Sequence, residues 1–302
     1  MAKVYKKANE RLALYFALAA VVMWSTVATA FKVALQYMSP SQLLFYAAMF
    51  SLVLLAVVVS YYKRWSDLRH WSGRQWLYSC FLGMMNPCLY YLLLFEAYNR
   101  LPAQEAQAIN YSWAIMLALL SVPFLKHKLS TRDIIAGLIC YTGVLVIATR
   151  GQVFSLEFTD QVGVLLALIS TFVWAISWIL GAKDSRDPVL GLMMNFAFAV
   201  PVLGLIILYQ DDLSLPVWQG VLAAGYVGVF EMGLAFVCWL QAMRLTSHAS
   251  SIGNLIFLSP FISLILIYLI LGEDIYISTV SGLLMILTGV FLQRYKRSDM
   301  AG

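Results

Sequence analysis

Residues 41–62 read SQLLFYAAMFSLVLLAVVVSYY, a run of 22 residues without a charged side chain. As an α-helix this run rises about 33 Å at roughly 1.5 Å per residue, which is enough to cross the roughly 30 Å hydrocarbon core of a bilayer. Residues 189–209, VLGLMMNFAFAVPVLGLIILY, form a second uncharged run of similar length. Both runs predict helices that span a membrane.

The composition of the whole chain also indicates that the protein lies in a lipid bilayer. Hydrophobic residues make up 62% of the 302 residues and charged residues only 12%, and the mean hydropathy is +0.81. Soluble domains carry about 25% charged residues, and a soluble protein with an oversized core is excluded because the apolar residues come in blocks of membrane-spanning length. The cysteines lie inside such blocks without metal-ligand spacing, so we interpret them as small buried hydrophobic residues: Cys80, Cys88, Cys140 and Cys238.

Polar and turn residues divide the chain into ten apolar ranges, so the expected fold class is an all-α polytopic membrane protein with ten transmembrane helices. No connection between them is long enough to hold a soluble domain. The first range follows a basic start but is too long for a signal-peptide core, so we expect it to be retained as a helix. The ten ranges are Leu12–Met38, Ser41–Tyr62, Gln75–Ala97, Ala103–Phe124, Thr131–Thr149, Gln161–Ala182, Val189–Tyr209, Pro216–Leu240, Ala249–Leu271 and Ile275–Gln293.

The distribution of Lys and Arg predicts the orientation, because these residues are retained on the cytoplasmic side during insertion. With the N-terminus inside, the inside segments hold 17 of the 20 basic residues, the outside segments hold Arg100 and Arg150, and Lys32 lies within a span. We therefore expect a multi-pass protein of the cytoplasmic (inner) membrane with both termini in the cytoplasm. The inside set is Lys3, Lys6, Lys7, Arg11, Lys63, Arg64, Arg69, Arg74, Lys126, Lys128, Arg132, Lys183, Arg186, Arg244, Arg294, Lys296 and Arg297.

Two parts of the chain resemble each other at an offset of 145 residues. Residues 97–103, AYNRLPA, run into the fourth range and resemble residues 242–248, AMRLTSH, which run into the ninth. We expect two five-helix repeats, residues 12–149 and residues 161–293. Because five is odd, the second repeat must enter the membrane from the opposite face, an inverted arrangement typical of secondary transporters that hold a solute between the halves.

Five short motifs lie in or beside the predicted spans: WST at 24–26, NYSW at 110–113, FVWA at 172–175, LSP at 258–260 and LGE at 271–273. With these motifs the chain resembles the drug/metabolite transporter superfamily and, within it, the EamA-type ten-helix transporters. The asparagine, tyrosine and tryptophan of the second motif resemble those of aromatic amino acid exporters. The chain departs from that pattern at Ala114, where those exporters carry a proline, and at Lys126-His127-Lys128, which replaces the Gly-Glu of the first repeat.

The resemblance implies an architecture and an activity. The architecture is a basket of ten helices around a central cavity, walled by helices one, three, four, six, eight and nine, with helices five and ten packed outside it. The implied activity is secondary active export of a small organic metabolite, such as an amino acid, by alternating access and often in exchange for protons. The resemblance implies no catalytic reaction.

We single out three ionisable residues within or at the end of predicted spans, where a central Asp, Lys or Arg costs roughly 2.5 to 3.5 kcal/mol. Glu231 lies near the middle of its span and aligns, at the 145-residue offset, with Asn86, which precedes Pro87. We expect Glu231 and Asn86 to contact the solute and Glu231 to exchange a proton; the alternative is a protonated carboxyl that bonds a neighbouring helix. Lys32 either acts in the cavity as a second proton-coupling group or extends its stem to the interface. Glu96 either pairs with Lys32 or lies at headgroup level.

Aromatic and amide side chains at mid-span positions supply the other candidate solute contacts. Aromatic faces hold planar or cationic solutes by stacking and cation–π attraction, worth about 0.5 to 2 kcal/mol each. The alternative is simple packing, since most of the 17 Phe, 17 Tyr and 9 Trp must face lipid or the interface. The candidates are Trp24, Tyr90, Asn110, Tyr111, Trp113, Trp174 and Trp178.

The sequence lacks the motifs of the main competing functions. It has no glycine-rich phosphate loop, no HExxH pair and no GxSxG, so we expect neither catalysis nor a bound cofactor or metal. A membrane-embedded enzyme or sensor with a central ligand cavity is the alternative, and an assembly factor with an unused cavity is a third hypothesis. The expected partners are a small-molecule solute and the lipid bilayer, without nucleic acid, and the expected state is a monomer or weak homodimer.

Overall fold

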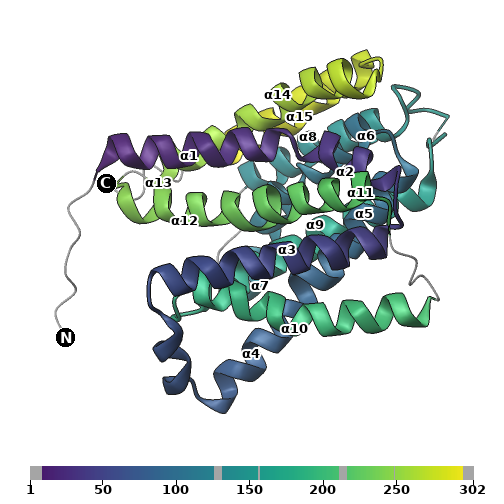
Figure 1. The fold of residues 1–302 in the computed structure, drawn as a ribbon. Helices are drawn as coiled ribbons and strands as arrows, with labels where there is room; N and C mark the ends of the chain where they lie inside the picture. Colours follow the sequence, from purple (N-terminus) through teal and green to yellow (C-terminus); the bar gives the residue numbers. More distant parts are fainter. Residues whose placement is uncertain (1–8, 126–130, 156, 211–215, 248, 295–302) are drawn as a thin grey trace.

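The computed structural model of the chain describes residues 9–125, 131–155, 157–210, 216–247 and 249–294. Over these residues the chain forms helices and no strand, and its long helices lie side by side in one bundle (Figure 1). The predicted departure at His127 lies outside these residues. So do seven of the basic residues used to predict the orientation: Lys3, Lys6, Lys7, Lys126, Lys128, Lys296 and Arg297.

The helices follow the predicted ranges in order, and several ranges are divided between consecutive elements. The first range holds α1 and α2, the third α4, η2 and α5, the fourth α6 and α7, the eighth α11, η3 and α12, and the ninth α13, η4, α14 and η5. The bounds are α1 Glu10–Ser25, α2 Val27–Leu35, α3 Pro40–Tyr61, η1 Trp65–His70, α4 Gly73–Gly83, η2 Met84–Leu89, α5 Tyr90–Arg100, α6 Ala103–Asn110, α7 Trp113–Leu125, α8 Thr131–Ala148, α9 Gln161–Lys183, α10 Pro188–Tyr209, α11 Trp218–Tyr226, η3 Val227–Leu234, α12 Ala235–Leu245, α13 Ala249–Asn254, η4 Leu255–Leu258, α14 Ser259–Leu266, η5 Ile267–Leu271 and α15 Ile277–Arg294.

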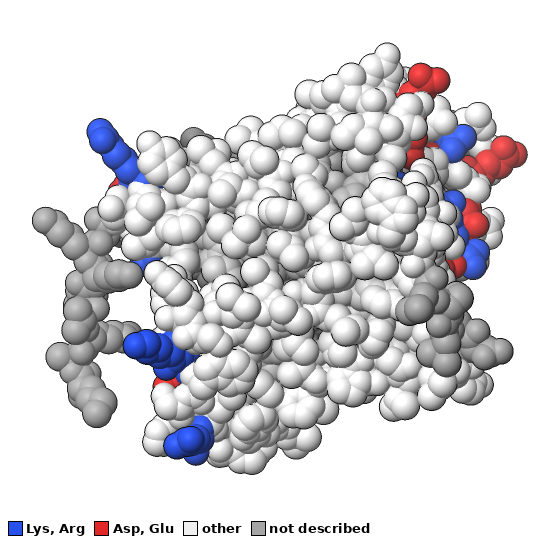
Figure 2. Space-filling model, viewed as in Figure 1, with Lys and Arg blue, Asp and Glu red and all other residues white. Residues whose placement is uncertain are grey.

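Eight helices of the described residues are long and apolar enough to cross a membrane. The fourth predicted range, which holds α6 and α7, is not among them, and the tenth holds only the shorter apolar stretch Ile277–Leu292. Charged side chains gather at the two ends of the bundle, with a broad uncharged band between them (Figure 2). The chain is therefore an all-helical, multi-pass membrane protein, and the count of ten spans stays a prediction.

The long helices are interrupted near their middle. In η2, Asn86 leaves the helical conformation with φ −148° and ψ 115°, and Pro87 has no N–H to continue the ladder. The segments η2 and η3 are π-helical, a rare form that is frequent at functional sites. In hydrocarbon, such interruptions are tolerated where protein or a cavity satisfies the freed backbone groups. They therefore mark the parts of these helices that face the interior.

The helices α8 and α15 pack directly against each other through small residues. A Cβ atom on Gly143 would lie 2.5 Å from the carbonyl oxygen of Gly282, so this approach of the two backbones requires glycine. Close contact of this kind supports helix association in lipid, where burial of apolar surface gives no driving force. Neither helix carries a candidate site residue, so this pair forms part of the scaffold.

A buried arginine anchors the loop between α9 and α10 to α4. The Arg186 side chain is 3% exposed and donates from Nη1 to the Gln75 carbonyl at 2.7 Å and to Ser79 Oγ at 2.6 Å. Its Nε donates to Asp184 Oδ1 at 2.9 Å, and its guanidinium lies 4.5 Å from the Trp71 ring centroid. Burial alone raises the pKa of Asp184, but the hydrogen bonds from Arg186 more than offset this and hold that pKa below its usual value.

Replacement of Arg186 by Gln is expected to lower the free energy of unfolding by about 3–5 kcal/mol, because it leaves the Asp184 carboxylate half-buried without its partner. Thermal unfolding of the detergent-solubilised protein measures the loss. Arg69→Gln, at an exposed position of η1, removes the same charge and is the control. Equal stability of the two variants would show that Arg186 contributes no more than a surface arginine.

Candidate functional site

The carboxyl group of Glu231 lies inside the bundle, in the middle of the α11–η3–α12 helix. The residue is 8% exposed, and Tyr91 of α5 donates its hydroxyl to Glu231 Oε1 at 3.1 Å. Among the described residues, the buried Glu231 Oε2 has no hydrogen-bond partner. A buried carboxyl with one unused oxygen needs a proton on it or a donor brought to it. This oxygen is the group of the site best suited to bind a ligand donor.

Asn110 joins three helices at the point where α6 ends. Its Oδ1 accepts from the Tyr90 hydroxyl of α5 at 3.4 Å, and its Nδ2 donates to Ser170 Oγ of α9 at 3.2 Å. The side chain is half-buried. Since a mid-membrane amide needs partners, these two bonds fix where Asn110 lies.

A connected group of rings, which we call the aromatic cluster, surrounds these polar groups. Tyr90 contacts Trp174 with ring centroids 4.4 Å apart and Tyr91 at 4.7 Å. Trp174 in turn contacts Phe236 at 6.0 Å, and Phe236 contacts Trp24 at 5.5 Å. The cluster links α1, α5, α9 and α12 and consists of Trp24, Tyr90, Tyr91, Trp174, Trp178 and Phe236.

Six of the predicted site residues thus meet in one network: Trp24, Tyr90, Asn110, Trp174, Trp178 and Glu231. Tyr111 and Trp113 pack against the same hydrophobic core as Tyr90 and Trp174. No ring contact among the described residues joins them to the cluster, but Tyr111 interacts electrostatically with Tyr90 and Glu231 and so lies beside the site. Asn86 lies at the break in η2, and its side chain has no hydrogen bond to the cluster in the part of the chain that the structure describes.

Lys32 contacts backbone rather than a carboxylate. Its Nζ donates to the carbonyls of Tyr98 and Leu101 at 2.8 and 2.9 Å, at the C-terminal end of α5. The predicted alternative of a pair with Glu96 is wrong, because Glu96 Oε1 accepts from Arg100 Nε at 2.6 Å, one helical turn away. Lys32 therefore satisfies the carbonyls at the end of α5, a favourable place for a cation.

Sequence reasoning missed several residues of the site. Ser170 is one of 24 serines in the chain, and nothing in its pattern points to Asn110. Tyr91 and Tyr90 are neighbours, and only the rotation of α5 shows that Tyr91 meets Glu231. Glu105 is fully buried and pairs with Arg150 Nε at 2.8 Å, although an acidic residue in the first turn of a helix is unremarkable in sequence.

The position of α6, and with it Asn110, depends on the connection between η5 and α15. Glu273 Oε1 accepts from the Ala103 backbone N–H at 2.9 Å, the first residue of α6. Gln104 donates from Nε2 to the Asp274 carbonyl at 2.7 Å and accepts from Thr279 Oγ1 at 2.9 Å. A carboxylate at a helix N-terminus is favourable, so the second half of the chain holds the short helix that ends at Asn110.

The chemistry of the site is that of binding. The described residues contain no group of three or more His, Cys, Asp or Glu that could hold a metal. What they bring together is one buried carboxyl, one amide and several aromatic faces. This combination suits a small solute with a hydrogen-bond donor or positive charge at one end and a planar or apolar body.

Replacement of Tyr91 by Phe is expected to lower the free energy of unfolding by about 1–3 kcal/mol, because it leaves the buried Glu231 carboxyl without a partner. Adding Glu231→Met to that variant should recover most of the loss, since both polar groups are then gone. Thermal unfolding of the purified protein measures both effects. Tyr90→Phe removes a longer bond to the half-buried Asn110 and should cost less; an equal loss in the two single variants would contradict the assignment.

The chain is similar in sequence to a known protein family. The sequence profile of the EamA-like transporter family matches residues 11–149 and again residues 161–295. An uncharacterised transporter of Archaeoglobus fulgidus is 24% identical over 293 residues, which are 96% of this chain and 99% of the relative. The uncharacterised transporter YvbV of Bacillus subtilis is 26% identical over 282 residues, 91% and 89% of the two chains.

A solved crystal structure has the same fold. It superposes with a TM-score of 0.65 and 17% sequence identity, and the match covers 97% of this chain and all of the other. At that identity the likeness concerns the fold alone.

Proposed function

The chain belongs to the EamA-like transporter family, and from this premise we propose that it is a secondary active transporter that exports a small organic metabolite across the cytoplasmic membrane by alternating access. Its relatives are transporters, which points away from a membrane-embedded enzyme or sensor. The observation that carries the proposal is the buried Glu231 carboxyl beside the aromatic cluster, with one oxygen bonded by Tyr91 and the other unused.

We propose an amino acid or similar amine as the solute. A solute ammonium group gives Glu231 Oε2 the donor that the described residues do not provide, while an apolar or aromatic side chain lies against Trp174 and its neighbours in the cluster. The likeness of Asn110, Tyr111 and Trp113 to residues of aromatic amino acid exporters supports the same class of solute.

The interruptions of the helices support the proposed inverted repeats. At the 145-residue offset, the π-helical segment η2 corresponds to η3, and the break after Asn110 corresponds to the end of α13 at Asn254 within one residue. The family profile also matches the chain twice, once on each side of residue 155. Residues 12–149 and 161–293 are thus proposed as two five-helix repeats with the solute between them.

The orientation follows from the basic end of the bundle. The described basic residues near the start of α1, around η1 and at the end of α12 lie at one end of the molecule, where blue side chains dominate in Figure 2. Acidic and basic side chains are mixed at the other end. By the positive-inside rule, we propose that the basic end and both termini face the cytoplasm.

Cysteine labelling tests this orientation. In a variant without the four native cysteines, Ser155→Cys should react with an impermeant maleimide applied to intact cells, because residue 155 lies in an exposed connection on the outer side. Ser66→Cys, exposed in η1, should react only after the membrane is opened. Labelling of Ser66→Cys alone in intact cells would reverse the topology.

Glu231 is the proposed coupling group, holding either a proton or the amine of the solute. Once the solute leaves, a bare carboxylate in this buried position is costly, and a proton from the opposite side replaces the solute. Binding of proton and solute to one oxygen is therefore mutually exclusive, which is the requirement for exchange. Asn86, its partner at the repeat offset, does not titrate.

Glu231→Gln keeps the shape and hydrogen bonds of the side chain but removes the exchangeable proton. In proteoliposomes, accumulation of an aromatic amino acid driven by a pH gradient is expected to fall to the level of empty liposomes, while counterflow of the same solute survives in part. Glu96→Gln, the same change at a surface pair with Arg100, should leave both measurements unchanged.

Two outcomes would contradict these proposals separately. Normal pH-driven accumulation by Glu231→Gln would exclude the coupling role and leave Glu231 as a structural hydrogen-bonding group. Absence of any flux from wild-type liposomes, together with chemical conversion of the solute, would favour the enzyme alternative over transport.

A further inference from the structure

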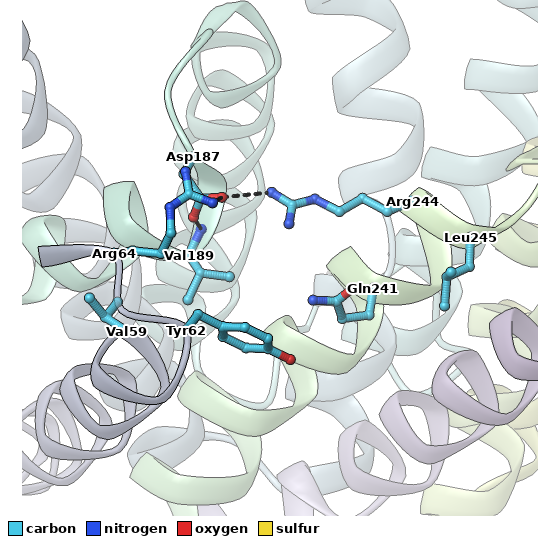
Figure 3. A pocket seen from close by; sticks show the side chains of 8 residues that line it. All are labelled: Val59, Tyr62, Arg64, Asp187, Val189, Gln241, Arg244 and Leu245. Carbon is cyan, nitrogen blue, oxygen red and sulfur yellow. Dashed lines mark hydrogen bonds and ion pairs between the residues drawn. The ribbon is translucent and has the colours of Figure 1, made fainter. Parts of the chain in front are cut away.

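A pocket of about 280 Å³ opens at the basic end of the bundle, between the end of α3, the start of α10 and the end of α12. Its polar lining consists of Tyr62, Arg64, Asp187, Gln241 and Arg244. The Arg64, Arg244 and Gln241 side chains extend toward the space between these elements (Figure 3). Arginine only donates hydrogen bonds, and glutamine and tyrosine both donate and accept, so the pocket offers several donors around one acidic group, Asp187.

The charges in the lining are unbalanced. Both guanidinium groups contact the same oxygen, Asp187 Oδ2, at 3.4 Å from Arg64 Nη1 and 3.1 Å from Arg244 Nη2. Asp187 Oδ1 meanwhile accepts from the N–H groups of Val189 and Leu190, both at 3.0 Å, and so caps α10. Two cations share one carboxylate that is already in use, which leaves one net positive charge in the lining.

Each arginine keeps unused donors. Both side chains are 43% exposed, whereas Asp187 is 11% exposed. Arg64 also holds Asp67 through Nε at 2.5 Å, outside the pocket lining. Among the described residues, Arg244 has no hydrogen bond other than that to Asp187. Free guanidinium N–H groups from two elements that face one space are suited to an oxyanion, above all the phosphate group.

The surroundings of the pocket are those of a membrane interface. Three aromatic residues beside it are strongly exposed, Tyr61 at 80%, Tyr62 at 54% and Trp65 at 46%, as in the aromatic belt at headgroup depth. One turn and two turns before Tyr61 on the same face of α3, Val57 and Val53 are 60% and 63% exposed. Val57 and the lining residue Val59 are about 200° apart around α3, so this exposed apolar face meets lipid on the outside of the helix and is not part of the pocket lining.

We propose that this pocket binds the phosphate of an anionic membrane lipid, with the phosphate between Arg64 and Arg244 and the acyl chains in the surrounding bilayer. The lipid source is favoured over free phosphate because part of the lining is apolar, namely Val59, Val189 and Leu245. The exposed aromatic residues at the end of α3 also indicate headgroup depth. Basic pockets between helices on the cytoplasmic side are suited to such headgroups. The proposal does not depend on the solute or on coupling through Glu231.

Native mass spectrometry of the full chain, purified in detergent, tests the site with phosphatidylglycerol and phosphatidylcholine of identical acyl chains. Wild type is expected to retain phosphatidylglycerol preferentially. Arg64→Gln/Arg244→Gln should weaken its retention by about tenfold or more, which corresponds to roughly 1.4 kcal/mol. Arg69→Gln/Arg74→Gln removes two exposed charges from the same end of the molecule and should leave retention unchanged.

Asp187→Asn gives an effect of opposite sign. Asparagine still caps a helix N-terminus, but the carboxylate that competes for both guanidinium groups is gone, so phosphatidylglycerol should bind more tightly than to wild type. This variant keeps the proposal testable if the double arginine variant does not fold. Weaker lipid retention by a folded Asp187→Asn protein would overturn the site, as would equal loss in the two double variants.

A competition with inorganic phosphate separates the two sources of the ligand. Displacement of phosphatidylglycerol only by phosphate far above physiological concentration supports the lipid as occupant. Displacement at low millimolar phosphate, with no preference for phosphatidylglycerol over phosphatidylcholine, would overturn it in favour of a soluble anion.

Discussion

Every backbone N–H and C=O of a chain in hydrocarbon must find a partner within the protein, and this constraint shapes the molecule. The turn between α5 and α6 shows how it is met, because two ionic side chains serve there as caps. Lys32 bonds the last carbonyls of α5, and Glu273 bonds the first N–H group of α6. Both charges are thereby satisfied by backbone dipoles, and two helix ends can lie inside the protein. The site at Asn110 depends on this arrangement, since α6 is only eight residues long.

The charged groups at the basic end contribute differently to the stability of the protein because they differ in burial. Arg64 and Asp67 form an exposed pair of the kind that contributes about 0–1 kcal/mol. Arg186 is buried, and all of its contacts are to one carboxylate, one hydroxyl, one carbonyl and two rings. Loss of such a group leaves its buried partner, here the Asp184 carboxylate, without a counter-charge, which lowers the free energy of unfolding. The architecture therefore rests on a few buried polar contacts, and exposed ion pairs are free to exchange partners with lipid or solvent.

Hydropathy and charge were sufficient to predict that this is a membrane protein. The thickness of the bilayer sets the length and composition of the helices that cross it, and insertion sets the charge of their connections. Glu231 and Asn110 were also predictable, since polar groups at mid-depth are costly and few. Partners were not predictable: Tyr90 and Tyr91 differ by about 100° around α5, and only packing decides that Tyr91 meets Glu231. The wrong pairing of Lys32 with Glu96 has the same origin, because a lysine stem reaches backbone carbonyls as readily as carboxylates. Helix interruptions such as η3 contain no proline and leave no mark in the sequence.

The contact between Tyr91 and Glu231 has a consequence for the proposed alternating cycle. At the 145-residue offset, Glu231 corresponds to Asn86 and Tyr91 corresponds to Phe236. In an inverted repeat the two halves exchange conformations between the inward-open and outward-open states. The bond from a tyrosine hydroxyl to a carboxyl would then be replaced, in the mirrored state, by a phenylalanine ring facing an amide, which cannot form the same bond. Under the proposed inverted-repeat cycle, the two open states of the empty carrier would therefore differ in free energy, and a ligand would shift their balance only by its differential affinity for them. A proton or an amine on Glu231 would supply such a difference in affinity, because each changes the strength of the hydrogen bond that the carboxyl accepts from Tyr91.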